Sequence, residues 1–168
     1  MALERKERWV KDGHRTPIPE WSTFAGVVSR ESVRIAFTHA ALYGLPVCAA
    51  DIHNAYLQAP ASKKHYVICG PEFGLENIGK IAVIVRALYC GKSANADYWR
   101  YVRHTMTELG FQSCKADPDV WFRPSIKSDG TNYYQYVLIY TADILEIMEE
   151  PERFLRDELE NVFTLKEK

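Results

Sequence analysis

The sequence predicts an α+β fold, with helices packed on one face of a mostly antiparallel sheet. From residue 46 onward, the predicted order is a strand, a segment with two further strands joined by a glycine-rich connection, a helix, a strand, a hairpin and a last helix. The helical segments are amphipathic, so each needs a sheet or another helix to cover its apolar stripe. The last two strand-like segments are separated by a tight turn, which is the connection between antiparallel neighbours.

A first helix is predicted over residues 29–44, after an irregular N-terminal stretch. Ser29 is a favourable N-cap, and Gly44 is typical of a helix end. Between them, apolar side chains recur at helical spacing, at Val33, Ala36, Phe37, Ala40 and Ala41. The apolar run at 47–52 then predicts a buried strand, which contains Asp51.

Two more strands are predicted at 65–69 and 81–85, on either side of a glycine-rich connection. A second helix is predicted over 93–109, and Gly110 ends it. Its apolar stripe consists of Tyr98, Val102, Met106 and Leu109.

The remaining elements are a strand at 117–122, a hairpin and a last helix. The hairpin strands are predicted at 133–140 and 144–148, and residues 141–143 between them are typical of a tight turn. Pro151 stands where the first residue of the last helix is expected. The stripe of this helix consists of Phe154, Leu155, Leu159 and Val162.

The composition fits one domain that needs no disulfide or metal to fold: 168 residues, 47% hydrophobic and 26% charged. The net charge of −1 argues against a strongly basic nucleic-acid-binding protein. The four cysteines form no CxxC pair, and Cys48 and Cys69 are predicted to be buried thiols in a reducing compartment. No apolar run approaches the roughly 18–20 residues of a membrane span, and the N-terminus is charged. We therefore expect an intracellular chain, cytoplasmic or nuclear, without a membrane partner.

Two carboxylates occupy unusual positions. Asp51 lies in an apolar strand, and Asp143 lies at the tip of an apolar hairpin. A charge in such a place is costly unless it is paired or bound to a metal, and hard oxygen ligands suit Mg²⁺. A salt bridge or a turn-capping role explains the same positions, so spacing alone leaves both interpretations open.

Five segments in order along the chain form a connected pattern. They are K-E-R-W-V-K-D-G-H (6–14), D-I-H-N-A-Y-L (51–57) with P-E-F-G (71–74), R-A-L-Y-C-G-K-S-A (86–94), L-G-F-Q-S-C-K-A-D-P-D-V-W (109–121) and Y-V-L-I-Y-T-A-D-I-L (136–145). Together they resemble the fingers segment, motif A and its sequel, and the palm motifs of copia-type retrotransposon reverse transcriptases. The resemblance covers residues 6–168.

The resemblance implies a right-hand polymerase palm with partial fingers. Residues 1–45 would be a partial fingers segment with the first helix. Residues 46–168 would be the palm with inserted fingers strands, and the whole would form one structural unit. The implied activity is RNA-directed DNA polymerisation, a nucleotidyl transfer with two Mg²⁺ ions, a primer-template and dNTP as partners.

The resemblance also implies roles for individual residues. Asp51 and Asp143 would be catalytic metal ligands, and the Ile52 carbonyl would help to hold the metal. Tyr56 would be the steric gate that excludes a 2′-hydroxyl from the incoming nucleotide. Three basic side chains would contact the nucleotide: Lys6, Arg8 and Lys92.

The departures from the family pattern concern the same site. The first Asp of the hairpin pair is Ala142 here, so three carboxylates become two, and we expect a catalytically dead or nearly dead chain. Cys90 replaces a Gly and Asn95 another small residue, which alters the surroundings of Lys92.

The resemblance places a thumb, a connection and an RNase H region beyond Lys168, so we expect a truncated copy with a weak grip on duplexes. Two interpretations stay open. The chain is either a catalytically impaired reverse transcriptase or a non-catalytic palm remnant that binds nucleic acid or a protein. Both hold whether Ala142 is natural or was introduced.

Overall fold

The computed structural model describes residues 10–16, 18–20 and 22–166. They form two compact units that interleave along the chain. The hairpin unit comprises the described residues up to Phe24 and Tyr56–Tyr98, and the sheet unit comprises Ala25–Ala55 and the described residues from Trp99 onward.

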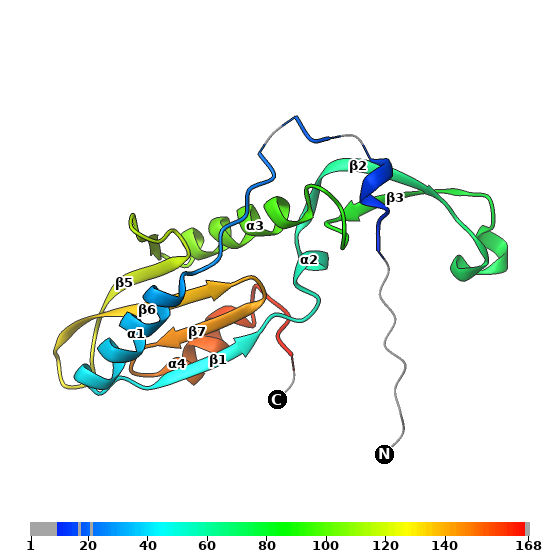
Figure 1. Ribbon diagram of the computed structural model, residues 1–168. Helices are drawn as coiled ribbons and strands as arrows, with labels where there is room; N and C mark the ends of the chain where they lie inside the picture. Colours follow the sequence, from blue (N-terminus) through cyan, green and yellow to red (C-terminus); the bar gives the residue numbers. More distant parts are fainter. Residues whose placement is uncertain (1–9, 17, 21, 167–168) are drawn as a thin grey trace, which may run out of the picture. The chain divides into compact units, whose positions relative to one another are not determined.

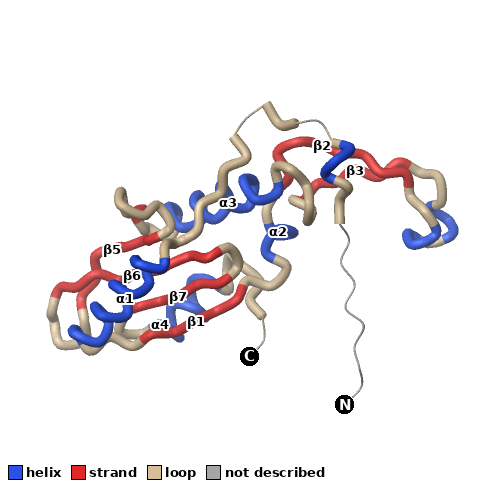
Figure 2. Tube along the Cα trace, in the orientation of Figure 1, coloured by secondary structure: helices blue, strands red, loops and turns tan. Residues whose placement is uncertain are grey.

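The sheet unit contains a five-stranded antiparallel sheet in the order β1-β7-β6-β5-β4 (Figures 1 and 2). Every neighbouring pair of strands is antiparallel, which confirms the α+β class. The strands are β1 (Val47–Asp51), β4 (Gln112–Ser113), β5 (Val120–Ile126), β6 (Asn132–Tyr140) and β7 (Asp143–Ile147). The predicted hairpin is therefore confirmed, whereas β4 was not predicted because two residues carry no periodic signal.

Three helices accompany this sheet: α1 (Arg30–Tyr43), α3 (Ala94–Glu108), of which the residues from Trp99 onward belong to the sheet unit, and α4 (Pro151–Phe154). The predicted caps of α1 are confirmed: the Ser29 hydroxyl accepts a hydrogen bond from the Ser32 amide at 3.1 Å, and Gly44 adopts a left-handed φ of 61°. Pro151 begins α4 as predicted, but the helix then continues as a π-helical turn over Leu155–Leu159.

The helices cover both faces of the sheet, so the prediction of helices on one face is wrong. Residues Val33 and Ala36 of α1 pack on the core around Leu138, and Val120 of β5 belongs to the same cluster. The next residue, Trp121, points to the opposite face, because side chains alternate along a strand. There the Arg103 guanidinium of α3 lies 5.1 Å from the Trp121 ring centroid. Apolar periodicity shows that a helix has a face to bury, but not which side of a sheet receives it.

Strand β1 is the edge of the sheet and is only half-buried, which corrects the prediction of a buried strand. Val47 is 39% exposed, and Cys48 is half-buried rather than buried as predicted. The prediction for Cys69, in the hairpin unit, is confirmed, since this thiol is buried. An apolar run alone does not distinguish an edge strand from a central one.

The hairpin unit is built on an antiparallel two-stranded ribbon of β2 (Pro60–Ile68) and β3 (Ile81–Arg86). The ribbon confirms both predicted strands, although β2 begins five residues before the predicted start at residue 65. Short helical turns complete the unit: η1 (Gly13–Arg15), η2 (Pro71–Phe73), η3 (Leu75–Asn77) and α2 (Ala55–Gln58), of which the residues from Tyr56 onward belong to this unit.

One arginine ties the sheet to the C-terminal helical turns. The Arg123 guanidinium makes a two-point ion pair with Glu158, at 2.8 and 2.7 Å, and donates to the Gln135 side chain at 2.6 Å. It also lies over the rings of Phe111 and Phe154, at 4.5 and 5.4 Å. The ion-pairing oxygens and the planar cation match in geometry, so this contact is stronger than an ordinary surface pair.

We expect Arg123→Met to lower the free energy of unfolding by about 2 kcal/mol, because it leaves the Glu158 carboxylate without its partner. Urea unfolding followed by circular dichroism measures this loss. The matched control is Arg153→Met: Arg153 pairs with Glu150 while 66% exposed, and such exposed pairs contribute little to stability. Equal losses in the two variants would contradict the structural role of Arg123.

Asp117 fastens the start of α1 to the connection before β5. One carboxylate oxygen accepts hydrogen bonds from the Ser29 amide at 2.9 Å and the Ser32 hydroxyl at 2.6 Å. Burial raises the pKa of Asp117, but the hydrogen bonds from Ser32 and Ser29 outweigh it, so the pKa lies below the ordinary 3.8. The charged form therefore stabilises the fold.

Asp117→Asn is expected to cost about 1 kcal/mol of stability near neutral pH, because an amide accepts these bonds less strongly. The sign of the pH effect follows from the lowered pKa. The stabilisation is complete above pH 3.8 and is lost as the pH falls through the folded-state pKa. Urea unfolding should thus show that the difference in unfolding free energy between the unaltered chain and Asp117→Asn disappears in acid. A gap that stays constant with pH would contradict this assignment.

Candidate functional site

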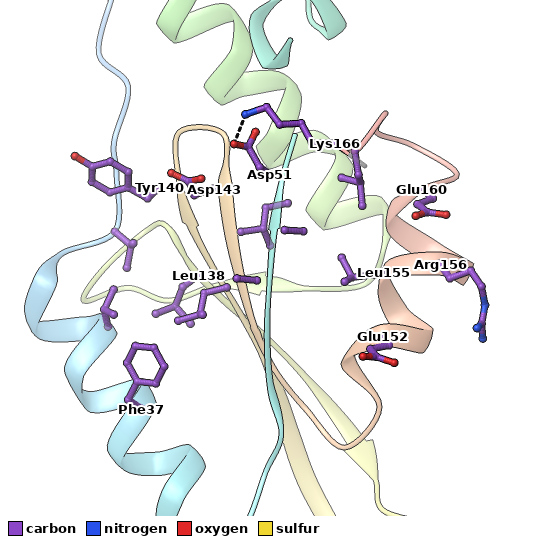
Figure 3. A pocket seen from close by; sticks show the side chains of 17 residues that line it. Phe37, Asp51, Leu138, Tyr140, Asp143, Glu152, Leu155, Arg156, Glu160 and Lys166 are labelled. Carbon is purple, nitrogen blue, oxygen red and sulfur yellow. Dashed lines mark hydrogen bonds and ion pairs between the residues drawn. The ribbon is translucent and has the colours of Figure 1, made fainter. Parts of the chain in front are cut away.

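The two carboxylates singled out in the sequence lie next to each other on the sheet. Asp51 of β1 is directly opposite Asp143 of β7, and Asp143 is directly opposite Tyr140 of β6. Paired residues of antiparallel strands share a face, with Cβ atoms about 4.5–5.5 Å apart. The three side chains therefore form one row across the end of the sheet (Figure 3).

The β6–β7 turn brings position 142 to the same place. The Ile52 amide donates a hydrogen bond to the Ala142 carbonyl at 2.8 Å, so the tip of the hairpin is attached to the residue that follows Asp51. Thr141 has a φ of 53°, a conformation that is costly for a β-branched residue. Ala142 is half-buried, and its methyl group offers no ligand atom.

The C-terminal segment reaches the same strand end. The His53 amide donates to the Thr164 carbonyl at 2.8 Å, and the Lys166 amide donates to the Asp51 carbonyl at 2.9 Å. The Lys166 ammonium then forms an ion pair with Asp51 Oδ2 (Figure 3). Sequence reasoning did not identify Lys166, because 115 positions separate the two residues and no local pattern connects them.

The site can supply two carboxylates to a cation. Asp51 Oδ1 is buried and has no hydrogen-bond partner, while the Asp143 side chain is exposed. Within the described part of the chain, no three His, Cys, Asp or Glu side chains gather closely enough to hold a metal ion. Two carboxylates are hard oxygen donors of the kind that a divalent cation prefers, and they are fewer than the ligand set that two dications need.

A groove of about 970 Å³ runs from these carboxylates along the sheet unit (Figure 3). Its apolar lining includes Val33 and Phe37 of α1, Leu138 and Leu145 of the sheet, and Leu155 of the C-terminal helical turns. Asp51, Asp143 and Lys166 lie at one end of the groove. Three further charged side chains line its side next to the C-terminal helical turns: Glu152, Arg156 and Glu160 (Figure 3).

Comparison with known protein families shows which family this chain belongs to. The family model described as reverse transcriptase (RNA-dependent DNA polymerase) matches residues 2–167. The chain belongs to this family. The family is the copia-type one that the motifs resemble, which confirms that assignment. No curated protein and no solved structure matched in the corresponding searches.

The other residues for which the family resemblance implies a role lie in the hairpin unit or outside the described residues. The Tyr56 ring packs edge-on against the rings of Tyr89 and Tyr98, with centroids 5.0 and 5.4 Å apart. Burial raises the pKa of the Tyr56 hydroxyl, and the electrostatic effect of Tyr89 raises it further. Lys92 donates to the Thr16 carbonyl at 2.6 Å. Two predicted nucleotide contacts, Lys6 and Arg8, lie outside the described residues.

The departure at Cys90 falls where the backbone favours glycine. Cys90 has a φ of 63°, and its carbonyl oxygen lies only 2.4 Å from the place that a Cβ on Gly13 would occupy. A left-handed conformation costs a non-glycine residue about 1–2 kcal/mol. The chain adopts this left-handed turn with a cysteine in it, two residues before Lys92.

None of the helices in the described part of the reverse transcriptase is long and apolar enough to cross a membrane.

Proposed function

We propose that this chain is an RNA-directed DNA polymerase whose catalytic centre is impaired, with the sheet unit as palm and the hairpin unit as part of the fingers. The observation that carries the proposal is Ala142. It lies at the tip of the β6–β7 hairpin, hydrogen-bonded to the residue after Asp51 and beside Asp143. This is where a third carboxylate of a two-metal site would complete the ligand set.

In this proposal Asp51, the Ile52 carbonyl and Asp143 hold Mg²⁺. Mg²⁺, when bound, would supply the Lewis acidity that activates the primer 3′-hydroxyl and stabilises the departing pyrophosphate. Four side chains of the fingers region bind the incoming dNTP: Lys6, Arg8, Tyr56 and Lys92. The primer-template would lie against the palm.

The loss of one carboxylate weakens this site in two ways. It removes about one unit of negative charge and one or two oxygen ligands, so the second dication lacks a sufficient ligand set. When residues act together as a catalytic unit, the effects of their substitutions on the rate are strongly non-additive. Losing one member lowers the rate by orders of magnitude, up to about a million-fold. We therefore expect a chain with the architecture of a polymerase that synthesises little or no DNA.

Primer extension on an RNA template with Mg²⁺ or Mn²⁺ tests the proposal. We expect the chain to extend a DNA primer no faster than its Asp51→Asn variant, which lacks the one ligand that every version of the site needs. Robust synthesis by the unaltered chain, abolished in Asp51→Asn, would overturn the claim of impairment while leaving the polymerase assignment in place.

One observation favours a second function, a non-catalytic role in binding nucleic acid or a protein. One face of the β2–β3 ribbon exposes a contiguous row of apolar side chains, and Lys64 lies on the same face. The row consists of Tyr66, Ile68, Ile81, Val83 and Val85, all between 43% and 72% exposed. A gel shift with single- and double-stranded RNA and DNA at several salt concentrations tests nucleic-acid binding. Absence of a shift at low salt would exclude nucleic acid as the partner.

A further inference from the structure

The end of the described chain is anchored at the candidate metal site by backbone hydrogen bonds. Leu165 forms a β-bridge with Ile52, flanked by the bonds from the His53 amide to Thr164 and from the Lys166 amide to Asp51. This pairing resembles a short extra strand on the continuation of β1. It places the Lys166 side chain beside the Asp51 carboxylate instead of leaving it free in solvent.

The Lys166 ammonium occupies the position on Asp51 that a metal ion would need. It pairs with Oδ2, while Oδ1 of the same carboxylate is buried without a hydrogen-bond partner. The Lys166 side chain is 50% exposed and the Asp51 side chain 34%, so the contact lies at the mouth of the groove, where a cation from solution would arrive. Figure 3 shows Lys166 and Asp143 on the two sides of Asp51.

We propose that Lys166 is a built-in competitor of the divalent cation: its ammonium group neutralises Asp51 and lowers the affinity of the site for Mg²⁺. The inference rests on the proposed function, because it assumes that Asp51 and Asp143 are the metal ligands. It adds Lys166, a residue outside the ligand set, as the residue that controls the affinity of these ligands for the cation.

Two physical arguments support the competition. A dication at Asp51 would meet the positive charge of Lys166 within a few ångströms, and this repulsion weakens binding of the dication in a partly buried site. The ammonium is also tethered through its own backbone, which gives it an effective concentration of at least about millimolar at the carboxylate. A free cation must displace this neighbour before it can bind Oδ2.

Mn²⁺ binding by the full chain tests the proposal, with the free Mn²⁺ signal in electron paramagnetic resonance as readout and no need for activity. We expect Lys166→Met to tighten Mn²⁺ binding roughly tenfold or more, because one positive charge is removed. Lys166→Arg keeps the charge and should bind Mn²⁺ as weakly as the unaltered chain. Lys115→Met, which removes an exposed lysine before β5, controls for the change in net charge.

The double variant Lys166→Met with Asp51→Asn should lose the gain in Mn²⁺ affinity. That loss would show that the gain depends on the Asp51 carboxylate. Equal affinity in Lys166→Met and the unaltered chain would overturn the proposal. If Ala142→Asp then tightens Mn²⁺ binding, the proposed function still stands and only the role of Lys166 fails. If neither variant tightens binding, the metal site itself fails, and the inference is overturned with it. Circular dichroism of each variant shows that it is folded.

Discussion

Ala142→Asp is expected to restore divalent-cation binding at the end of the sheet and to raise the initial rate of primer extension roughly a hundredfold or more. The physical reason is local. The Ala142 carbonyl accepts a hydrogen bond from the Ile52 amide, so the backbone of residue 142 lies next to the residue that follows Asp51. Ala142 is half-buried, which leaves room for the larger side chain to reach solvent or a bound ion.

The matched control for this prediction is Ala142→Asn. Asn has the same shape as Asp and offers one oxygen, but it adds no charge, so we expect only a small gain in Mn²⁺ affinity. Electron paramagnetic resonance measures the affinity, and extension of a labelled primer on RNA measures the rate. An Ala142→Asp chain that binds Mn²⁺ no more tightly than Ala142→Asn would contradict the assignment of the site. Adding Asp51→Asn should abolish the gain, because the restored site needs both carboxylates.

Phe163→Ala is expected to have the largest effect on stability, a loss of about 3–4 kcal/mol. Phe163 is 2% exposed and packs edge-on against Tyr101 of α3, with ring centroids 5.7 Å apart. Its amide donates to the Leu159 carbonyl at 2.8 Å, so the ring is held at the end of the last helical turn. Truncation to Ala leaves a cavity that this rigid setting cannot fill.

The same change should also loosen the segment that carries Lys166. Amide hydrogen exchange at His53 and Lys166 reports on the two hydrogen bonds of that segment, and we expect both amides to lose protection in Phe163→Ala. Val162→Ala is the control, because Val162 is 36% exposed and its truncation should cost less than about 1 kcal/mol. Urea unfolding compares the two variants. Similar losses, or unchanged protection in Phe163→Ala, would contradict the anchoring role of Phe163.

Elements with local signals were predicted closely. Ser29 and Gly44 bound α1 because capping depends on residues within a few positions of the helix end. The Tyr140↔Asp143 pair closes the predicted hairpin for the same reason, since a tight turn sets the register of the strands that it joins. The edge position of β1 and the placement of helices on both faces were not predicted, because both depend on the order of strands in the sheet.

From its residues alone the chain could be assigned to its family, and Asp51, Asp143 and Ala142 could be singled out, because these conclusions follow from which residue types stand at which motif positions. Two contacts of the site follow from the folded chain alone: Asp51 and Asp143 face each other across β1 and β7, and Lys166 pairs with Asp51. Such contacts join residues about 90 to 115 positions apart, and the packing of the whole sheet unit creates them. A carboxylate that the sequence marks as a metal ligand is, in the folded chain, already paired with a cation of its own.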